Sequence, residues 1–357
     1  MVIYHCLIGC ITVSFVVGLI DLLRGSPWGI GDELRRGFDM AGPLLLLMTG
    51  YICLAPVLAA ILKPSLLPLA HLFGVDPSFA AGLCLAVDSG GAPLAMEMAD
   101  SYALGKFSGY VVGSVLGPTL TFTVPVALMG KNLKESGPII KGLMAGIIAA
   151  PTGIFVGGLL LGLPFDRLMK QMVPLVLFVL FLTVLLKKYP QLMAAFLMFL
   201  AKVSLVVSYG GLACVLIQHV FSYSILPDLL SFTDAAVTVG GIALLLGGAY
   251  PFVVLIHRLT ASCLDPILIK FGFSEEGAAG LMMTVVNSMA MFSRLGKMSE
   301  NDAVLNTAFA VSGAWLLGDH FCFVAQVEPD LLMPVFISKL VASSASVCFA
   351  RFVLLRQ

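Results

Sequence analysis

The sequence predicts an all-α membrane protein that crosses the bilayer many times. Hydrophobic residues make up 59% of the 357 residues, charged residues make up only 11%, and the mean hydropathy is +1.04. A soluble domain carries roughly 25% charged residues. The apolar runs reach the ~20 residues that a helix needs to cross a hydrocarbon layer, and the alternating pattern of barrel strands is absent. Because backbone amides find no water inside a bilayer, helices are the remaining structure.

About eleven transmembrane helices are expected. The apolar runs lie near residues 2–23, 37–62, 78–98, 105–129, 139–163, 167–187, 192–223, 234–258, 277–297, 301–325 and 331–355. The first run is too long for a signal peptide and has no basic residues before it, so we expect it to remain as a span. The connecting loops are short, so residues 1–357 are expected to form a single transmembrane domain. Basic residues flank the spans on both sides, which leaves the orientation open.

Charge and cysteine usage exclude several classes of function. The formal net charge is zero and no basic block occurs, so nucleic acid is not an expected partner. The 8 cysteines are scattered without a CxxC pair, and the 5 histidines lack ligand spacing. We therefore expect no disulfide framework, metal site or cofactor. Membrane lipid and a small-molecule substrate are the expected partners, and a homo-oligomer is left open.

An internal repeat indicates two related halves. Residues 73–87 recur as residues 271–285 with 7 identities in 15 positions, which include Ala80-Ala81-Gly82-Leu83 and Ala278-Ala279-Gly280-Leu281. Weaker echoes follow in the same order, which favours a duplication of the kind common in transporters. The expected first repeat covers about 37–163 and the second about 234–355, with connecting helices at about 167–223. Whether the halves are parallel or inverted depends on the number of spans and stays open.

Helix breaks are predicted near residues 88–93 and 287–290. Asp88 lies about ten residues into an apolar run and is followed by Ser89-Gly90-Gly91 and Pro93. Glycine and proline interrupt a helix and free backbone groups to coordinate a polar ligand. A carboxylate at this depth is costly unless it faces a cavity or a partner, so Asp88, Ser89, Gly90 and Gly91 are candidate binding residues. Alternatively, Asp88 caps the second half of the helix.

Two further groups of polar residues lie inside apolar runs. Asp319 and His320 follow Gly318, and a carboxylate beside an imidazole can bind a cation or relay a proton. The alternative is an internal pair that locks two helices together. Asn287 and Ser288 stand in the second half where Asp88 and Ser89 stand in the first. They supply uncharged hydrogen-bonding groups, either to a ligand or between helices.

The buried polar residues favour a pocket for a small cation. Tyr51, Tyr250 and Trp315 lie near the polar motifs, and an aromatic face attracts a desolvated ammonium by about 2 kcal/mol. Most aromatic residues in membranes serve packing or the interface instead. Acidic groups at depth outnumber basic ones, because Lys141 and Lys202 lie close to predicted span ends and can reach water. An amine that carries a hydroxyl could use the carboxylates together with the Asn, Ser and Tyr groups.

A series of ordered motifs carries a family resemblance along essentially the whole chain. They include Leu54-Ala55-Pro56-Val57-Leu58, Asp88-x-Gly90-Gly91 with Leu94-Ala95-x-Glu97, Gly113-Ser114-x-x-Gly117-Pro118-Thr119, Ala249-Tyr250-Pro251 and Leu317-Gly318-Asp319-His320. With these motifs the chain resembles the EutH family of ethanolamine utilisation permeases. It departs from the family where Asn287-Ser288-Met289-Ala290 replaces paired asparagines followed by proline. This departure bears on substrate selectivity more than on the class of protein.

The resemblance implies a multi-pass permease of the bacterial inner membrane. It would take up protonated ethanolamine for catabolism, by facilitated or ion-coupled transport, and agrees with the cation pocket. In that function Asp88 and Asp319 are expected to neutralise the ammonium. The hydroxyl is expected to contact Asn287, Ser89 or His320, and the pocket walls are expected to be Tyr51, Tyr250 and Trp315.

Three alternatives stay open. The first is a transporter of another small amine or amino alcohol. The second is an intramembrane hydrolase that uses His320, which is the only histidine at depth beside an acid, although no serine or cysteine motif flanks it. The third is a non-transporting partner or sensor, which would be expected to carry a cytoplasmic domain or a long charged tail.

Overall fold

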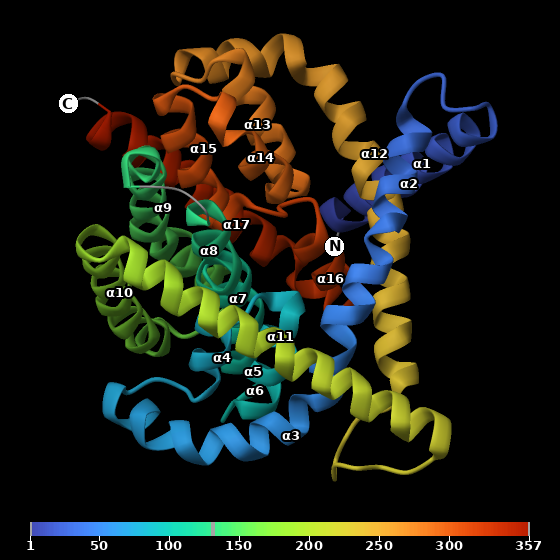
Figure 1. Ribbon diagram of the computed structural model, residues 1–357, viewed down its shortest axis with the longest axis vertical. Helices are drawn as coiled ribbons and strands as arrows, with labels where there is room; N and C mark the ends of the chain where they lie inside the picture. Colours follow the sequence, from blue (N-terminus) through green and yellow to red (C-terminus); the bar gives the residue numbers. More distant parts are fainter. Residues whose placement is uncertain (1, 130–132, 356–357) are drawn as a thin grey trace.

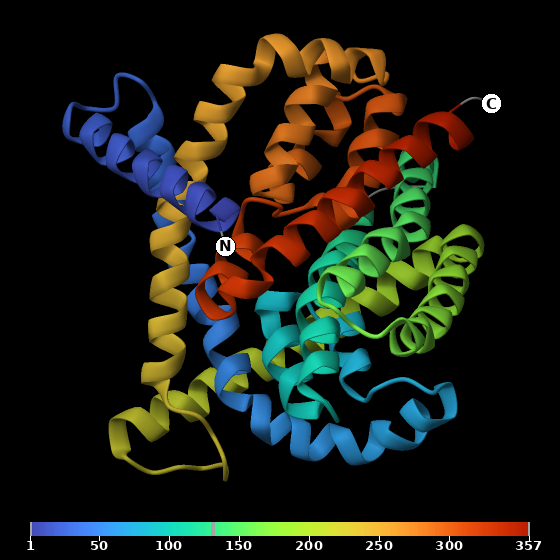
Figure 2. The ribbon, with the colours of Figure 1, turned by 180° about the vertical axis from the view of Figure 1, so that it is seen from behind.

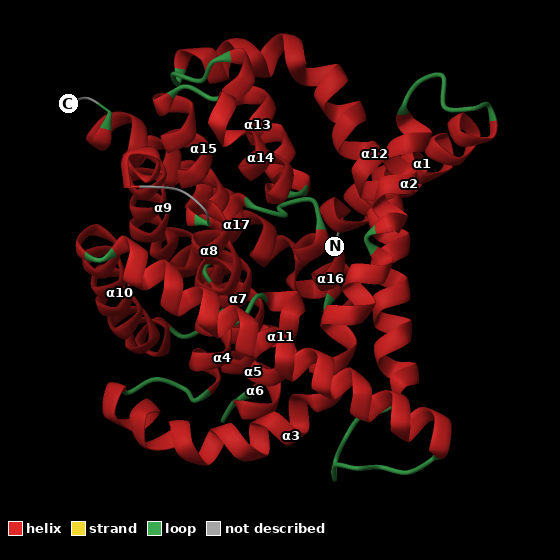
Figure 3. Ribbon diagram, viewed as in Figure 1, coloured by secondary structure: helices red, strands yellow, loops and turns green. Residues whose placement is uncertain are grey.

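The structure is a computed structural model that describes residues 2–129 and 133–355. These residues form helices joined by short loops, and none of them forms a strand (Figure 3). The α-helices are α1 (Val2–Leu23), α2 (Ile30–Asp39), α3 (Ala41–Phe73), α4 (Ser78–Cys84), α5 (Ala92–Met98), α6 (Tyr102–Lys106), α7 (Gly113–Val115), α8 (Val124–Leu128), α9 (Leu133–Leu160), α10 (Phe165–Lys188), α11 (Pro190–Phe221), α12 (Phe232–Lys270), α13 (Glu275–Val286), α14 (Ser288–Arg294), α15 (Glu300–Gly313), α16 (Asp319–Val327) and α17 (Leu332–Phe349). Short π or 3-10 segments join or extend them at η1 (Val87–Gly91), η2 (Phe107–Val112), η3 (Thr119–Thr123), η4 (Leu295–Lys297), η5 (Pro329–Leu331) and η6 (Ala350–Leu354).

The helical content agrees with a polytopic membrane protein. Among the described residues, 8 helical stretches are long and apolar enough to cross a membrane. They are Tyr4–Leu23, Ile30–Phe73, Tyr102–Leu128, Ser136–Leu160, Phe165–Lys188, Pro190–Phe221, Phe232–Lys270 and Pro329–Leu354. The three other runs expected to span, 78–98, 277–297 and 301–325, are each divided into shorter helices. Their apolar composition resembles that of spans, but their backbone is interrupted.

The run at 78–98 folds as a hairpin, which we call the first hairpin (α4, η1 and α5). The backbone N–H of Asp100 donates to Asp76 Oδ2 over 3.2 Å, so the two ends of this segment meet. Asp76 Oδ1 accepts from the N–H and the hydroxyl of Ser78 and thereby fixes the start of α4. Each arm has 7 residues and is therefore about 10 Å long. The segment consequently turns back at η1 and does not cross as predicted.

The run at 277–297 also turns back on itself, and we call α13 and α14 the second hairpin. Arg294 Nη2 lies 2.7 Å from Glu276 Oε1, which joins the end of α14 to the start of α13. The turn is at Asn287, whose backbone is extended with φ −152° and ψ 110°. Asn287 Oδ1 accepts from the N–H of Met289 and so caps α14.

Each hairpin packs against a neighbouring helix whose regular winding is interrupted. In the first case the interruption is a turn at Leu116, between α7 and η3, within the helical stretch Tyr102–Leu128. In the second it falls at 314–318, between α15 and α16, where the N–H groups of Trp315 and Leu317 donate to the carbonyls of Thr284 and Val285. Gly117 and Gly318 allow these close approaches, because a Cβ would overlap the carbonyl of Leu85 or of Val286. Buried irregular backbone is tolerated in a membrane protein where the protein itself supplies hydrogen-bond partners.

The two hairpins lie at opposite ends of the molecule. The first hairpin and α6 occupy the lower part of Figure 1, and the second hairpin occupies the upper part, with the same arrangement from behind in Figure 2. The last turns of α3 run along the lower edge, and those of α12 run along the upper edge. Helix α10 lies at the left of Figure 1, and α11 crosses the front of the molecule diagonally towards the lower right. The turns of both hairpins therefore point towards the middle of the molecule.

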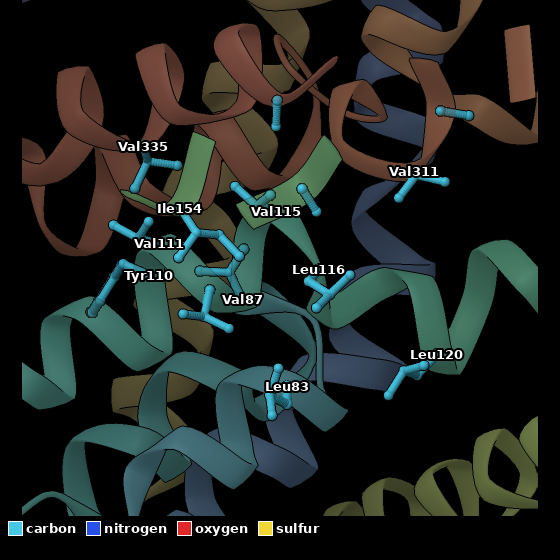
Figure 4. Close-up of a cluster of buried hydrophobic side chains, with 14 of the residues drawn as sticks. Leu83, Val87, Tyr110, Val111, Val115, Leu116, Leu120, Ile154, Val311 and Val335 are labelled. Atoms are coloured by element: carbon cyan, nitrogen blue, oxygen red, sulfur yellow. The ribbon is translucent and has the colours of Figure 1, made fainter. Parts of the chain in front are cut away.

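A hydrophobic core fixes the first hairpin against the C-terminal half of the chain. Leu83 and Val87 come from the first hairpin, Val115 from the interrupted helix beside it, and Val311 and Val335 from α15 and α17 (Figure 4). All five are buried. Because lipid is as apolar as these side chains, close van der Waals packing and not transfer from water holds such helices together. This core holds the polar turn of the hairpin in a defined position.

Candidate functional site

A cavity of about 430 Å³ lies between the turns of the two hairpins. Its walls come from the first half of α3, the middle of α11, residues 118–126, and the two interrupted helices. Its polar lining consists of Asp88, Ser89, Thr121, Ser204, Ser208, Asn287, Asp319 and His320. At roughly 30 Å³ per water molecule, this volume accommodates a small organic ion and several waters.

Most of the predicted binding residues meet in this cavity. The lining includes Tyr51, Asp88, Ser89, Asn287, Trp315, Asp319 and His320. Three others do not line it: Gly90 and Gly91, which form the turn behind Asp88, and Tyr250, which is buried on α12. These residues were predicted because the sequence places charged residues beside glycine and proline inside apolar runs.

A second cavity of about 500 Å³ has a different character. It lies between the end of α3, α4 and α10, and its lining is apolar apart from Asp76. Both oxygens of Asp76 already accept hydrogen bonds at the base of the first hairpin. This cavity offers no free polar group among the described residues to orient a charged ligand, so the cavity between the hairpins is the candidate site.

Asp88 is held at the turn of the first hairpin. Gly90 has φ +97°, and a Cβ at this position would overlap the ring of Tyr51, so a glycine is required there. The Ser89 hydroxyl donates to Asp88 Oδ1 over 3.2 Å. Asp88 is only 6% exposed, and that exposure faces the cavity.

Asp319 is the first residue of α16 and has fewer partners. Its Oδ1 is buried and accepts no hydrogen bond from any described residue. The hydroxyls of Tyr250 and Ser288 are likewise buried and without a partner in the described part of the chain. A buried polar group left without a partner costs roughly 1–3 kcal/mol. Of these three residues only Asp319 lines the cavity, so it is the one to which a ligand or water there can supply the missing hydrogen bond.

Sequence reasoning missed one buried charge, Lys339 on α17. Buried acidic groups outnumber buried basic ones among the described residues, as expected, but Lys339 is only 2% exposed and is the only Lys or Arg buried there. Its Nζ donates to the carbonyl of Ser114 over 2.8 Å and lies 3.2 Å from His320 Nδ1. His320 Nε2 in turn lies 3.8 Å from Asp88 Oδ1. A lysine eight residues into the apolar run at 331–355 is the signal that could have revealed it.

The helix break beside the first hairpin explains why Ser114 is available to Lys339. In a continuous helix its carbonyl would accept from the N–H of residue 118, which is Pro118 and has none. The carbonyl is therefore free to accept from the ammonium. Pro118 thus leaves the Ser114 carbonyl without a helical partner, and this carbonyl binds the Lys339 ammonium.

An aromatic wall closes one side of the cavity. The centroid of the Trp315 ring lies 5.1 Å from that of the His320 ring and 4.9 Å from that of the Phe122 ring. Trp315 has φ +56°, a conformation that costs a residue of this kind about 1–3 kcal/mol. The Tyr51 ring lines the cavity, while its hydroxyl hydrogen-bonds Ser204 on α11. The ring faces, not the Tyr51 hydroxyl, are therefore available to a ligand.

Comparison with known sequences places the chain in a family. The sequence profile described as "Ethanolamine utilisation protein, EutH" matches residues 3–353. The chain belongs to the EutH family. It is 35% identical over 347 residues to a protein of Listeria monocytogenes named "Probable ethanolamine permease EutH", covering 97% of this chain and 93% of the relative.

Two other relatives are similar over most of their length. A protein of the same name in Escherichia coli is 32% identical over 343 residues, covering 89% of this chain and 84% of the relative. The uncharacterised Bacillus subtilis protein YxeR is 35% identical over 324 residues, covering 90% and 87%. No solved structure matched the chain. With its apolar helices, this EutH member is a multi-pass protein of the bacterial inner membrane.

Proposed function

We propose that this protein is an ethanolamine permease that takes up the protonated amine for catabolism, by facilitated or ion-coupled transport. The observation that carries this proposal is the cavity between the two hairpins, in which two aspartates face an aromatic wall. An ammonium of one positive charge suits a carboxylate beside aromatic faces. The names of the curated relatives agree with this substrate.

The same cavity offers groups for the hydroxyl of ethanolamine. Asn287 uses its side-chain oxygen to cap α14, so its amide nitrogen is the group left to donate to a ligand. The Ser89 hydroxyl and His320 also line the cavity. A hydrolase is disfavoured, because the two ring nitrogens of His320 face Lys339 and Asp88 and not a serine or cysteine nucleophile.

The proposed site lies between two duplicated halves, which we infer to be inverted. The support is the matching order of a bent helix, a hairpin and an interrupted helix in residues 41–128 and 232–327, with the two hairpins at opposite ends of the molecule (Figures 1 and 2). Inverted repeats with interrupted helices meeting near the middle are a common architecture of secondary transporters. Of the eleven predicted helices, 78–98 and 277–297 are then the two hairpins that enter the membrane from opposite sides.

Uptake by the purified protein tests the proposed substrate. We expect saturable uptake of labelled ethanolamine into proteoliposomes, which excess unlabelled ethanolamine abolishes. Choline tests recognition of the cation and ethylene glycol tests recognition of the hydroxyl alone, and we expect only the former to compete. Absence of uptake under every imposed gradient, from protein that elutes as a folded species, would contradict the proposal.

A further inference from the structure

We infer that Lys339 is a built-in counter-ion for Asp88, so that Asp319 is the carboxylate that pairs with the transported cation. This inference rests on the proposed function and specifies which group in the site recognises the ammonium. It rests on how each buried charge in the described part of the chain is satisfied.

The carboxylates of the buried aspartates outside the cavity accept hydrogen bonds that stabilise the fold. Asp21 accepts from the backbone N–H groups at residues 28, 30 and 31, which fixes the loop before α2. Asp76 holds the base of the first hairpin. Asp302 accepts from Ser274 and Ser299 at the base of the second hairpin. Asp88 and Asp319 are therefore the buried carboxylates that remain for a ligand.

Asp88 and Lys339 are connected through His320. A charged Lys339 offers only donors, so it pairs with the tautomer of His320 in which Nδ1, 3.2 Å from the ammonium, accepts. The imidazole proton then resides on Nε2, which faces Asp88 Oδ1 at 3.8 Å. Lys339 does not line the cavity, so it lies behind His320 and outside the reach of a ligand. It acts on the site as a positioning residue and as a fixed charge.

The charge that remains suits a single monovalent cation. Asp88 and Lys339 cancel, and a neutral His320 contributes nothing, which leaves the charge of Asp319. No Lys, Arg or His among the described residues forms an ion pair with Asp319, whereas Asp88 Oδ1 lies 3.8 Å from His320 Nε2 and receives the Ser89 hydroxyl. Asp319 is thus the carboxylate of the cavity that lacks a counter-ion. This arrangement would select a monoamine over a diamine.

Variants that neutralise the buried charges distinguish the role of Asp88 from that of Asp319. Removing the charge of Asp88 leaves Lys339 uncompensated, so Asp88→Asn should weaken binding of labelled ethanolamine to the purified protein by about 100-fold. Asp88→Asn combined with Lys339→Gln restores the net charge and should recover binding to within about tenfold of wild type. The matched double variant, Asp319→Asn with Lys339→Gln, has the same net charge and should stay about 100-fold weaker than wild type.

Three outcomes distinguish the possible failures. Wild-type protein that binds no ethanolamine refutes the proposed function itself. Wild-type binding with equal recovery in both double variants refutes the inference, since only net charge would then matter. Recovery in neither, from protein that remains monodisperse and unfolds at the wild-type temperature, also refutes it.

A diamine gives an independent measurement with a single variant. Lys339→Gln frees Asp88 while its amide can still donate to Ser114. We expect 1,3-diaminopropane, which carries two positive charges, to compete with labelled ethanolamine at least about tenfold better in this variant than in wild type. An unchanged ratio of diamine to ethanolamine affinity in folded Lys339→Gln protein would contradict the role of Lys339 as the counter-ion of Asp88.

Discussion

At the scale of single residues, the two carboxylates of the cavity have different surroundings although both are almost fully buried. Asp88 receives a hydrogen bond from Ser89 and faces His320, which Lys339 holds from behind. Asp319 has a free acceptor beside the cavity. Burial of an unpaired charge in a membrane protein is costly, so such a group persists where a ligand pairs with it. Asp319 is therefore the residue on which substrate binding should depend most.

Replacing Asp319 with asparagine should abolish transport without unfolding the protein. The substitution keeps the size of the side chain and removes the charge, so we expect labelled ethanolamine uptake to fall by at least about 100-fold. Asp166→Asn is the matched control, because Asp166 is exposed at the first turn of α10 and does not line the cavity. Equal uptake by both variants would show that Asp319 does not bind the substrate.

At the scale of elements, the two hairpins determine where the polar groups meet. The first hairpin needs a glycine at its turn, because Gly90 combines φ +97° with contact to the Tyr51 ring. The second uses Asn287 in extended backbone as the cap of α14. Both hairpins are short and close at their bases through Asp76 or through the ion pair of Glu276 and Arg294. Their turns are thereby positioned without crossing the membrane.

Adding a methyl group to the turn of the first hairpin should impair transport. Gly90→Ala forces a side chain into a conformation that costs about 1–2 kcal/mol and into the space of the Tyr51 ring. We expect a lower thermal unfolding midpoint and a loss of ethanolamine binding in detergent. Gly42→Ala on α3 is the control, since no atom lies within 4 Å of a Cβ there. Wild-type binding by Gly90→Ala would mean that this turn does not shape the site.

At the scale of the whole molecule, the inverted arrangement would present the two hairpin bases to opposite sides of the membrane. The first hairpin leads into α6, and Tyr102 at the start of α6 is 64% exposed. The second hairpin ends near Lys297, which is also exposed. Helix α6 lies in the lower part of the molecule and the second hairpin in the upper part (Figure 1). The cavity between the turns would then be reached alternately from each side.

Labelling of single cysteines tests this topology. In a chain whose 8 native cysteines are replaced by alanine, we expect Tyr102→Cys and Lys297→Cys to react with a membrane-impermeant maleimide from opposite sides of oriented vesicles. Glu97→Cys, at the end of the first hairpin and exposed, should react from the same side as Tyr102→Cys. Reaction of Tyr102→Cys and Lys297→Cys from one side would exclude the inverted arrangement.

Sequence reasoning located the chemistry of the site better than the path of the chain. Buried Asp88 and Asp319 stand out because charge is rare in apolar segments, and both line the cavity. It did not predict that the segments 78–98 and 277–297 are hairpins, because a segment that crosses the membrane and one that turns back within it have the same apolar composition. Their return depends on contacts such as that between Asp76 and Asp100, which involve residues far apart in sequence. The pairing of Lys339 with His320 likewise depends on the packing of two helices.

The structure of the purified protein determined with saturating ethanolamine tests the location of the site most directly. The account predicts new density between the turns of the two hairpins, with the amine within hydrogen-bonding distance of Asp319 and near the face of Trp315. Density in the apolar cavity beside α10 would contradict it. So would the absence of density between the hairpins in protein that demonstrably transports ethanolamine.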